Sequence, residues 1–354
     1  MKKFFLAFLL TLLLANVYSF GQTSRDALAP KSNPAEALTK QLFGATICTT
    51  SLEETLLFYR DGMGLSVTGP VLLDAKTKAK ERKMYDIPTD IDWQLYILDR
   101  PTVPSAIKIR LMVLNKPTPT IHQSWNSLEY GPFSLGFPNL KQAIVDSLIR
   151  QKGFGSQAAM NVYPVTAGDN SKYTVYETIF NGPDFVKGVG ITRGDGMPQL
   201  SPTDPLTGMG GPGYSAMILQ DSQTFIDFLV NVLGLELRAD RIWTTSGALG
   251  VPAGTQYRFA LVYAKGAAHG HQLLIEFLNA KGIYTGVAMK IPNRGLGCWT
   301  FPCKNLNTVL LAAKAQNIKI IQEPTLYHSP FYGNKKAMTL VAPNGFLIEL
   351  FEEQ

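Results

Sequence analysis

Histidine and cysteine are scarce in this sequence, which has four histidines and three cysteines among 354 residues. Three cysteines allow at most one disulfide and leave a thiol over. Cys298 and Cys303 are five residues apart, so on a strand they would lie on opposite faces, and we expect no bridge between them. No nucleophile elbow, zinc-protease helix or P-loop occurs. These absences exclude a disulfide-dense scaffold and three common catalytic motifs.

Charged residues are also few, at 17%, whereas 45% of residues are hydrophobic, which suits a globular protein of about two domains. The formal net charge is +6, and much of the excess lies in residues 76–83. A nucleic-acid patch would combine such charges with aromatic or groove-reading partners. We therefore predict a solvated surface helix or loop here, and no nucleic-acid partner.

The longest apolar run lies at the N-terminus. Lys2 and Lys3 precede the 14 mainly apolar residues 4–17, and the small residues Ser19 and Gly21 follow. This pattern is typical of a secretory signal peptide and is too short for a stable membrane span. An uncleaved anchor is the alternative, and the lack of a following cysteine disfavours a lipoprotein signal. We predict a signal peptide at residues 1–21, export to the periplasm or outside the cell, and a mature protein without a membrane span.

The sequence contains an internal duplication. Residues 51–64 and 221–234 each begin with a helix N-cap candidate, carry apolar residues at helical spacing and end on glycine. Residues 139–153 and 305–317 form a second pair, each starting with asparagine. Gly64 and Gly234 are 170 residues apart, and the two asparagines are 166 apart. A unit of two modules has therefore been duplicated, and each module is predicted to be strand, helix and three strands.

Turn signals divide the chain further. Pro343-Asn344-Gly345 separates two apolar runs, residues 337–342 and 346–351, which predicts a hairpin. Residues 193–213 are dense in Gly, Pro, Ser and Asp and lack periodicity, which is typical of a linker.

These segments resemble the vicinal oxygen chelate superfamily, which includes glyoxalase I, extradiol dioxygenases and bleomycin-resistance proteins. The resemblance rests on the two cap–helix–glycine segments and on Ala342-Pro343-Asn344-Gly345 with Glu349, similar to the family's Asp-Pro-x-Gly hairpin and closing glutamate, with Ala342 in place of the aspartate. It covers residues 40–354. It implies an α+β fold of four βαβββ modules, paired into two cupped, incompletely closed mixed β-sheets with helices packed outside. We expect a first domain at residues 40–192 and a second at residues 214–354.

Side-chain alternation supports two cups. In residues 132–137 and 298–302, bulky apolar residues alternate with small or polar ones such as Cys298 and Thr300. The bulky set should lie under the helices, and the small set should line a concave cavity.

The family's metal ligands lie on the first and last strands of each module. The equivalent first-strand residues are Gly44, Pro132, Tyr214 and Cys298, and the last-strand residues are Met112, Gly188, Glu276 and Glu349. None is a histidine, and the first domain has no plausible ligand set, so its site is expected to be degenerate.

The second domain is the candidate site. We expect Tyr214, Glu276, Cys298 and Glu349 to converge on one cavity. Two carboxylates suit a divalent metal ion, and a Cys298 thiolate would suit a softer one. Without a metal, Glu276 and Glu349 could act as general acid and base. The alternative is that each glutamate pairs with a Lys or Arg, or faces solvent.

The histidines add little. His328 and Tyr332 precede the final hairpin, where extradiol dioxygenases carry supporting residues, so with Tyr214, Cys298 and Thr300 they are predicted to line the pocket. His269 and His271 could bind a metal as a pair, but a surface role is favoured. His122 carries no signal.

The functional expectation is an exported glyoxalase/dioxygenase-like protein that acts on or binds a small organic molecule in the second domain. If it is an enzyme, the resemblance implies a lyase, an isomerase or a dioxygenase. The alternative is a non-catalytic, bleomycin-resistance-like binding protein, which the missing histidines favour. An interaction protein whose cups are filled with side chains is a third possibility.

Overall fold

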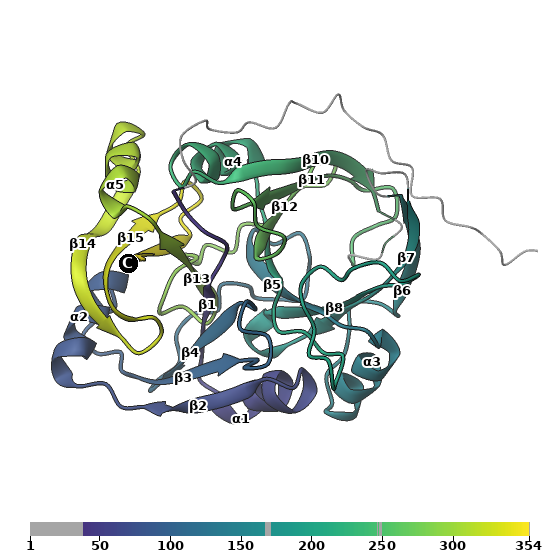
Figure 1. Cartoon of the computed structure of the whole chain (residues 1–354), viewed down its shortest axis with the longest axis horizontal. Helices are drawn as coiled ribbons and strands as arrows, with labels where there is room; N and C mark the ends of the chain where they lie inside the picture. The colour runs from purple at the N-terminus through teal and green to yellow at the C-terminus, as the bar shows by residue number, and fades with distance from the viewer. Residues whose placement is uncertain (1–37, 167–170, 246, 248–249, 354) are drawn as a thin grey trace, which may run out of the picture.

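The computed structural model describes residues 38–166, 171–245, 247 and 250–353. These residues form two curved mixed β-sheets of eight strands each, with helices on their outer faces (Figure 1). Within the same residues, no helix has both the length and the apolar character needed to cross a bilayer. The predicted signal peptide lies outside the described residues.

Each of the four modules is built as predicted, and the first carries an additional helix. Module 1 contains β1 (Gly44–Thr49), α1 (Leu52–Leu56) continued by the π-helical turn η1 (Leu57–Gly62), β2 (Ser66–Val71), α2 (Ala75–Tyr85), β3 (Trp93–Asp99) and β4 (Lys108–Leu114). Module 2 contains β5 (Gly131–Pro138), α3 (Gln142–Gln151), β6 (Asn161–Thr166), β7 (Lys172–Asn181), η2 (Pro183–Phe185) and β8 (Lys187–Arg193). Module 3 contains β9 (Tyr214–Ile218), α4 (Ser222–Asn231), β10 (Glu236–Thr244), β11 (Gln256–Tyr263) and β12 (His271–Phe277). Module 4 contains β13 (Gly295–Cys303), α5 (Leu306–Ala315), β14 (Lys319–Ser329), β15 (Gly333–Val341) and β16 (Leu347–Glu352).

The signals for the first helix pair and for the final hairpin are confirmed, whereas Asn139 does not cap α3, which follows Lys141 and has no side-chain cap. Ser51 and Asp221 cap α1 and α4 by accepting hydrogen bonds from backbone N–H groups three residues ahead. Gly64 and Gly234 have φ angles of +70° and +71°, a left-handed conformation that glycine adopts without strain after a helix. The final hairpin forms between β15 and β16.

The modules do not pair in the expected order. In every module the first strand lies parallel to the last, as with β1 and β4. The first strands then pair antiparallel, β1 with β13 and β5 with β9. Sheet I therefore joins modules 1 and 4, in the order β14-β15-β16-β13-β1-β4-β3-β2, and sheet II joins modules 2 and 3, in the order β10-β11-β12-β9-β5-β8-β7-β6. The linker between β8 and β9 connects two strands of sheet II, so it does not separate the two sheets.

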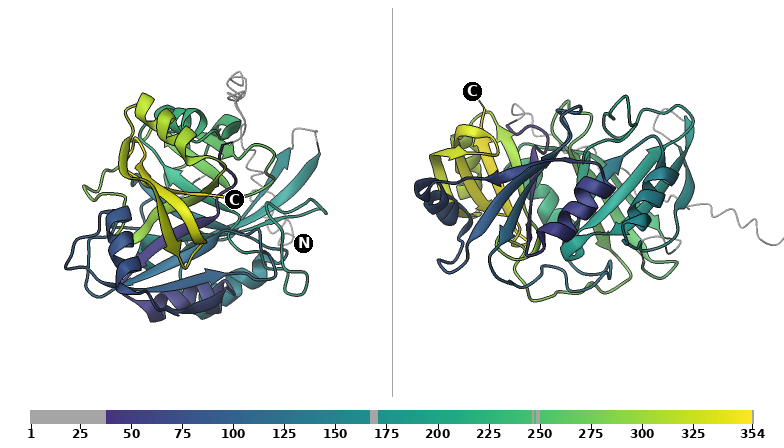
Figure 2. Two further views of the ribbon diagram at one scale, coloured as in Figure 1. Left: turned by 60° about the vertical axis from the view of Figure 1, so that its left-hand side comes forward. Right: turned by 90° about the horizontal axis from the view of Figure 1, so that it is seen from below.

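The convex faces of both sheets share one hydrophobic core with the helices. Leu135 and Phe137 of sheet II and Trp299 and Phe301 of sheet I belong to it, as the alternation predicted. Figures 1 and 2 show α1 and α3 on one side of the sheets and α4 and α5 on the opposite side. The Trp299 indole N–H donates to the Ser215 hydroxyl (2.9 Å), which links the two sheets. Helices α1, α3, α4 and α5 thus lie outside the cups, and each cup opens away from the shared core.

Candidate functional site

The cup of sheet I is filled by α2, which packs against β14 (Figure 1). Asp74 caps this helix, and Met84 and Tyr85 are buried against the concave face of the sheet. Glu81, on the same helix face, is 1% exposed. The prediction that residues 76–83 are simply a solvated element is therefore only half correct, because one face of α2 occupies the cup.

Two hydrogen bonds hold the Glu81 carboxylate inside the cup of sheet I. Its carboxylate accepts hydrogen bonds from the Trp93 indole N–H (3.0 Å) and from the Tyr327 hydroxyl. Burial raises the pKa of Glu81, although the nearby charge of Arg110 opposes the shift. The carboxylate is held by one donor from β3 and one from β14.

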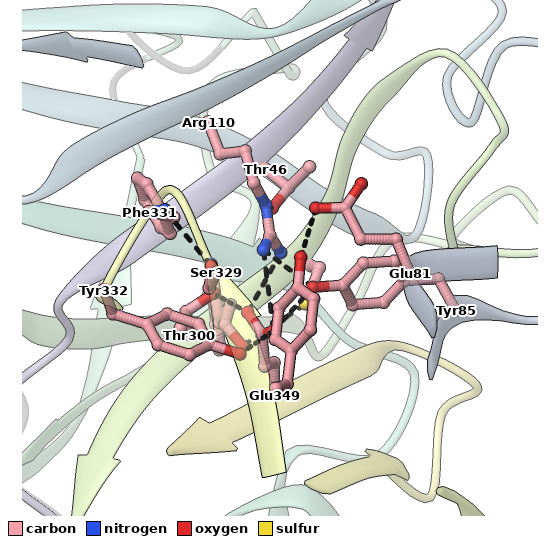
Figure 3. A network of polar contacts seen from close by, with 12 residues as sticks. Thr46, Glu81, Tyr85, Arg110, Thr300, Ser329, Phe331, Tyr332 and Glu349 are labelled. Atoms are coloured by element: carbon pink, nitrogen blue, oxygen red, sulfur yellow. Dashed lines mark hydrogen bonds and ion pairs between the residues drawn. The ribbon is translucent and has the colours of Figure 1, made fainter. Parts of the chain in front are cut away.

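Arg110 and Glu349 form the centre of the cup (Figure 3). Their side chains are 1% and 0% exposed, and Arg110 Nη2 lies 3.0 Å from Glu349 Oε2. The remaining hydrogen bonds of the pair go to Thr46 (2.9 Å from Arg110 Nε), Tyr85 (2.7 Å from Arg110 Nη1 and 2.5 Å from Glu349 Oε1), Tyr332 (2.9 Å from Oε1) and Thr300 (2.7 Å from Oε2). The pair is thus surrounded by hydroxyl groups.

This arrangement does not fit the metal that the family resemblance implies. Burial acts to lower the pKa of Arg110, but the charges of Glu349 and Tyr85 outweigh it and keep the pKa well above the ordinary value. A permanent guanidinium charge occupies the place beside Glu349 where a cation would bind. Nor does any group of three or more His, Cys, Asp or Glu side chains in the described part of the chain have an arrangement suited to a metal ion.

Cys298 lies in the same cup but is not a ligand. It is fully buried, and its thiol faces the Trp299 carbonyl oxygen (3.4 Å). Burial raises the pKa of Cys298, and the charge of Glu349 adds to this effect, so the group remains a neutral thiol. Only the thiolate binds a metal well.

Glu276 lies on the opposite, convex face of sheet II. Its carboxylate accepts hydrogen bonds from the backbone N–H (3.0 Å) and hydroxyl (2.6 Å) of Ser222, at the start of α4. A carboxylate at this position satisfies N–H groups that the helix leaves unpaired. Glu276 is therefore turned beneath a helix and does not enter either cup.

The prediction that Tyr214, Glu276, Cys298 and Glu349 share one cavity is wrong. Tyr214 and Glu276 belong to sheet II, and Cys298 and Glu349 belong to sheet I. The error follows from assuming that consecutive modules pair.

The other predicted pocket residues also belong to sheet I. Thr300 and Tyr332 contact Glu349, as described above. His328 lies on β14 opposite Asn334 and is exposed, so it does not contact this network.

The cup of sheet II, by contrast, encloses a cavity of about 240 Å³. Aromatic side chains form much of its wall: Phe133, Tyr163, Tyr173, Tyr214, Trp243, Tyr257 and Phe259. The polar side chains that line it are Ser134, Asn161, Glu177, Arg193, Arg241, Thr245 and His271. Of the residues predicted for the pocket, only Tyr214 is among them. A cavity with apolar walls and a few polar groups is the usual form of a small-molecule site.

Glu177 is the acidic group of this cavity. It lies on β7 and accepts a hydrogen bond from the Tyr163 hydroxyl (3.3 Å). Burial raises the pKa of Glu177 to about 7. Burial, and then the charge of Glu177, also raise the pKa values of Tyr214 and Tyr257. The carboxyl group can therefore change charge near neutral pH while these phenols stay protonated.

His271 lies between two aromatic rings at the cavity wall. Its ring is stacked on Tyr214 (centroids 5.1 Å apart) and on Tyr263 (4.4 Å). Burial lowers the pKa of His271 to about 3, with Arg193 contributing, so the imidazole is neutral. Its Nδ1, like the hydroxyl of Ser134, is buried and has no hydrogen-bond partner among the described residues. The predicted surface role of His271 is thus wrong.

Tyr214 can line the cavity because its neighbour is glycine. A Cβ atom at Gly136 would lie 1.9 Å from the nearest atom of the Tyr214 ring. The ring therefore lies directly over the Gly136 backbone, which only a residue without a side chain permits.

Sequence reasoning missed Glu177 and His271. His271 and Glu276 are five residues apart on β12, so their side chains lie on opposite faces of the strand. This spacing is the signal that could have placed His271 in the cup. On β7, Tyr173, Val175, Glu177 and Ile179 alternate with the other face. The family resemblance points to the first and last strands of each module, whereas β7 is an inner strand of module 2.

Solved structures with a similar architecture are known, although comparisons of the sequence alone find no match. No protein-family model matches the sequence, and no curated protein does. Among solved structures, glyoxalase I from Zea mays is similar over 89% of this chain and 92% of its own length, with a TM-score of 0.54 and 14% identity. A point variant of that enzyme gives a TM-score of 0.56 and 16% identity over the same shares. The chain therefore has the vicinal oxygen chelate fold, built from four modules that form two pairs, one nested within the other along the sequence.

Proposed function

We propose that this chain is an exported glyoxalase/dioxygenase-like protein that binds a small organic molecule in the cavity of sheet II. The observation that carries the proposal is the contrast between the two cups. One is filled by α2 and by the Arg110–Glu349 pair, and the other retains a cavity of about 240 Å³ with aromatic walls. The site lies between modules 2 and 3 and not in the C-terminal half alone.

Unsatisfied polar atoms support a ligand in this cavity. The buried Nδ1 of His271 and hydroxyl of Ser134 lack partners among the described residues, which costs free energy unless a bound molecule or water supplies one. Aromatic rings provide large apolar contact areas for such a molecule. Unsatisfied polar atoms beside aromatic walls favour a small-molecule-binding protein over an interaction protein whose cups are filled with side chains.

The binding proposal can be tested with uncharged aromatic probes. Titration calorimetry should detect the binding of indole and 2-naphthol to the cavity, which aromatic side chains such as Trp243 line. The variant Leu261→Trp, which fills part of the cavity wall, should weaken binding, whereas Leu326→Trp on the exposed face of β14 should not. Equal binding by both variants, or none by the unmodified protein, would contradict the proposal.

A catalytic role for the same cavity is the second candidate, and the pKa of Glu177 near 7 favours it. A carboxyl group with a pKa near neutrality is suited to general acid–base catalysis. Mass spectrometry of each bound probe after long incubation tests this role. Turnover that is lost in Glu177→Gln while binding persists would support an enzyme.

Export is proposed from the N-terminal pattern. The protein recovered outside the cytoplasm should begin at Phe20 or Gln22, following cleavage after Ser19 or Gly21. Sequencing of its N-terminal peptide decides this, and retention of Met1 in that fraction would favour the uncleaved anchor.

A further inference from the structure

Glu177 is only partly buried, but it differs from the buried carboxylates in having almost no partners. Glu349 pairs with Arg110, and Glu129 contacts His122 (3.3 Å) and accepts further hydrogen bonds from Ser124 and from a backbone N–H. For Glu177 the single hydrogen bond within the described residues is that from Tyr163, at 3.3 Å, and no ion pair with it is found there. A carboxylate that faces a largely apolar cavity without a counter-charge is costly.

The surroundings of Glu177 are suited to a positive charge. Tyr163 contacts the carboxylate directly, and the charge of Glu177 influences Tyr214 and Tyr257 from across the cup. The faces of aromatic rings attract cations, most strongly where water is excluded. Aromatic cages of this kind recognise alkylammonium groups.

We propose, resting on the binding function above, that the ligand of this cavity carries an ammonium group, with Glu177 as its counter-ion and the tyrosine rings around it as cation–π partners. The ligand class is therefore an organic amine or quaternary ammonium compound with an apolar or aromatic body. The apolar body would occupy the remaining wall, where Phe133 and Phe259 lie.

Two guanidinium groups line the same cavity and define the competing possibility. Arg193 is directed to the Tyr173 ring (5.5 Å to its centroid) and to the Pro198 carbonyl oxygen (3.3 Å). Arg241 lies on β10, at the edge of the sheet. If they governed recognition, the cavity would select an anion, and a carboxylate probe separates the two outcomes.

The charge state of Glu177 gives the proposal a pH signature. Tyr163, Tyr214 and Tyr257, which face it, have pKa values raised first by burial, so they stay neutral. His271 also stays neutral, since its pKa is about 3. Arg193 and Arg241 are the other charged side chains that line the cavity. A quaternary ammonium ion does not titrate, so its affinity should follow the ionisation of Glu177. As pH increases towards about 7, the affinity should rise by up to about tenfold per pH unit, and above about pH 7 it should level off.

The experiment uses three probes of similar shape and different charge. These are benzyltrimethylammonium, its uncharged isostere neopentylbenzene, and the anion phenylacetate, each titrated into the purified protein between pH 5 and 9. We expect the cation to bind about tenfold or more tightly than the isostere above pH 7. In Glu177→Gln, the cation should lose this advantage and its pH dependence, while the isostere binds as before.

A matched control removes a carboxylate elsewhere. Glu323 is exposed on β14 and pairs with Lys314, so Glu323→Gln should leave all three affinities unchanged. A merely structural role of Glu177 would weaken the uncharged probe as well, and that result overturns the inference. Tighter binding of phenylacetate, or equal binding of cation and isostere, also overturns it while leaving the binding function intact. If indole and 2-naphthol fail as well, the binding function itself falls.

Discussion

Arg110 on β4 and Glu349 on β16 lie 239 residues apart in the sequence and 3.0 Å apart in the centre of sheet I. Each comes from the last strand of its module, and the two modules are the first and the last of the chain. The family resemblance places metal ligands on these strands. Here a guanidinium and a carboxylate neutralise one another, so this cup is held together by the protein's own charges.

Removing either member of this pair should destabilise the protein strongly. Arg110→Met or Glu349→Gln leaves a buried group without its partner, at a cost of about 3–5 kcal/mol of unfolding free energy. The double variant Arg110→Met with Glu349→Leu should recover much of that loss, because neither member of the pair is left buried without its partner. Urea unfolding measures all three, with Lys314→Met of the exposed Lys314–Glu323 pair as the control, for which about 0.2–1 kcal/mol is expected. Additive single and double effects would contradict this account.

Gly136 and Tyr214 should behave as a coupled pair. Gly136→Ala places a methyl group on the Tyr214 ring and should cost about 1–3 kcal/mol through overpacking. In a Tyr214→Ala background the same substitution should cost little, since the ring is gone. Thermal unfolding of the four proteins in this double-mutant cycle gives the coupling, and a coupling near zero would show that the ring does not depend on the glycine.

Glu177 should make stability depend on pH. Its pKa is raised from 4.5 to about 7 in the folded protein, mainly by burial, so the folded state binds the proton more tightly than the unfolded state does. The stabilising contribution is complete below pH about 4.5 and is lost as pH rises through about 7. Chemical unfolding should show that the free energy of unfolding falls less between pH 5 and pH 7.5 for Glu177→Gln than for the unmodified protein. Glu323→Gln serves as the comparison, and identical declines in all three would argue against a raised pKa.

The cysteines should be unreactive until the protein unfolds. All three are free and buried, and burial raises the pKa values of Cys48, to about 12, and of Cys303, to about 11. Because the thiolate is the reactive form, a disulfide reagent such as 5,5′-dithiobis(2-nitrobenzoate) should release almost no colour from the native protein. Denaturant should then reveal three thiols. Rapid labelling of the native protein would mean that a cysteine is accessible.

Local features of the fold could be predicted from the sequence. The caps at Ser51 and Asp221 and the glycines that end the two helices depend on neighbouring residues alone, and all are confirmed. The period of two along β13 placed Trp299 in the core and Cys298 on the concave side.

The pairing of modules could not be predicted in the same way. A period-two pattern states which face of a strand is buried, but not which other strand lies beside it. The same limit hid the role of α2, since nothing local indicates that Tyr85 fills a cup built partly from residues more than 200 positions later. Arg110 was missed because the expected closing position was Met112, two residues further along the same face of β4.

The order of strands also sets an order of assembly. All eight strands of sheet II are available once the ribosome has passed Phe277, whereas sheet I remains incomplete until β16 is made. Gly44, at the start of β1, finds its partner Thr300 only near the end of synthesis. Sheet II can therefore form first, while β1 of module 1 still lacks its partner strand β13. An unpaired strand edge at this stage exposes the nascent chain to aggregation.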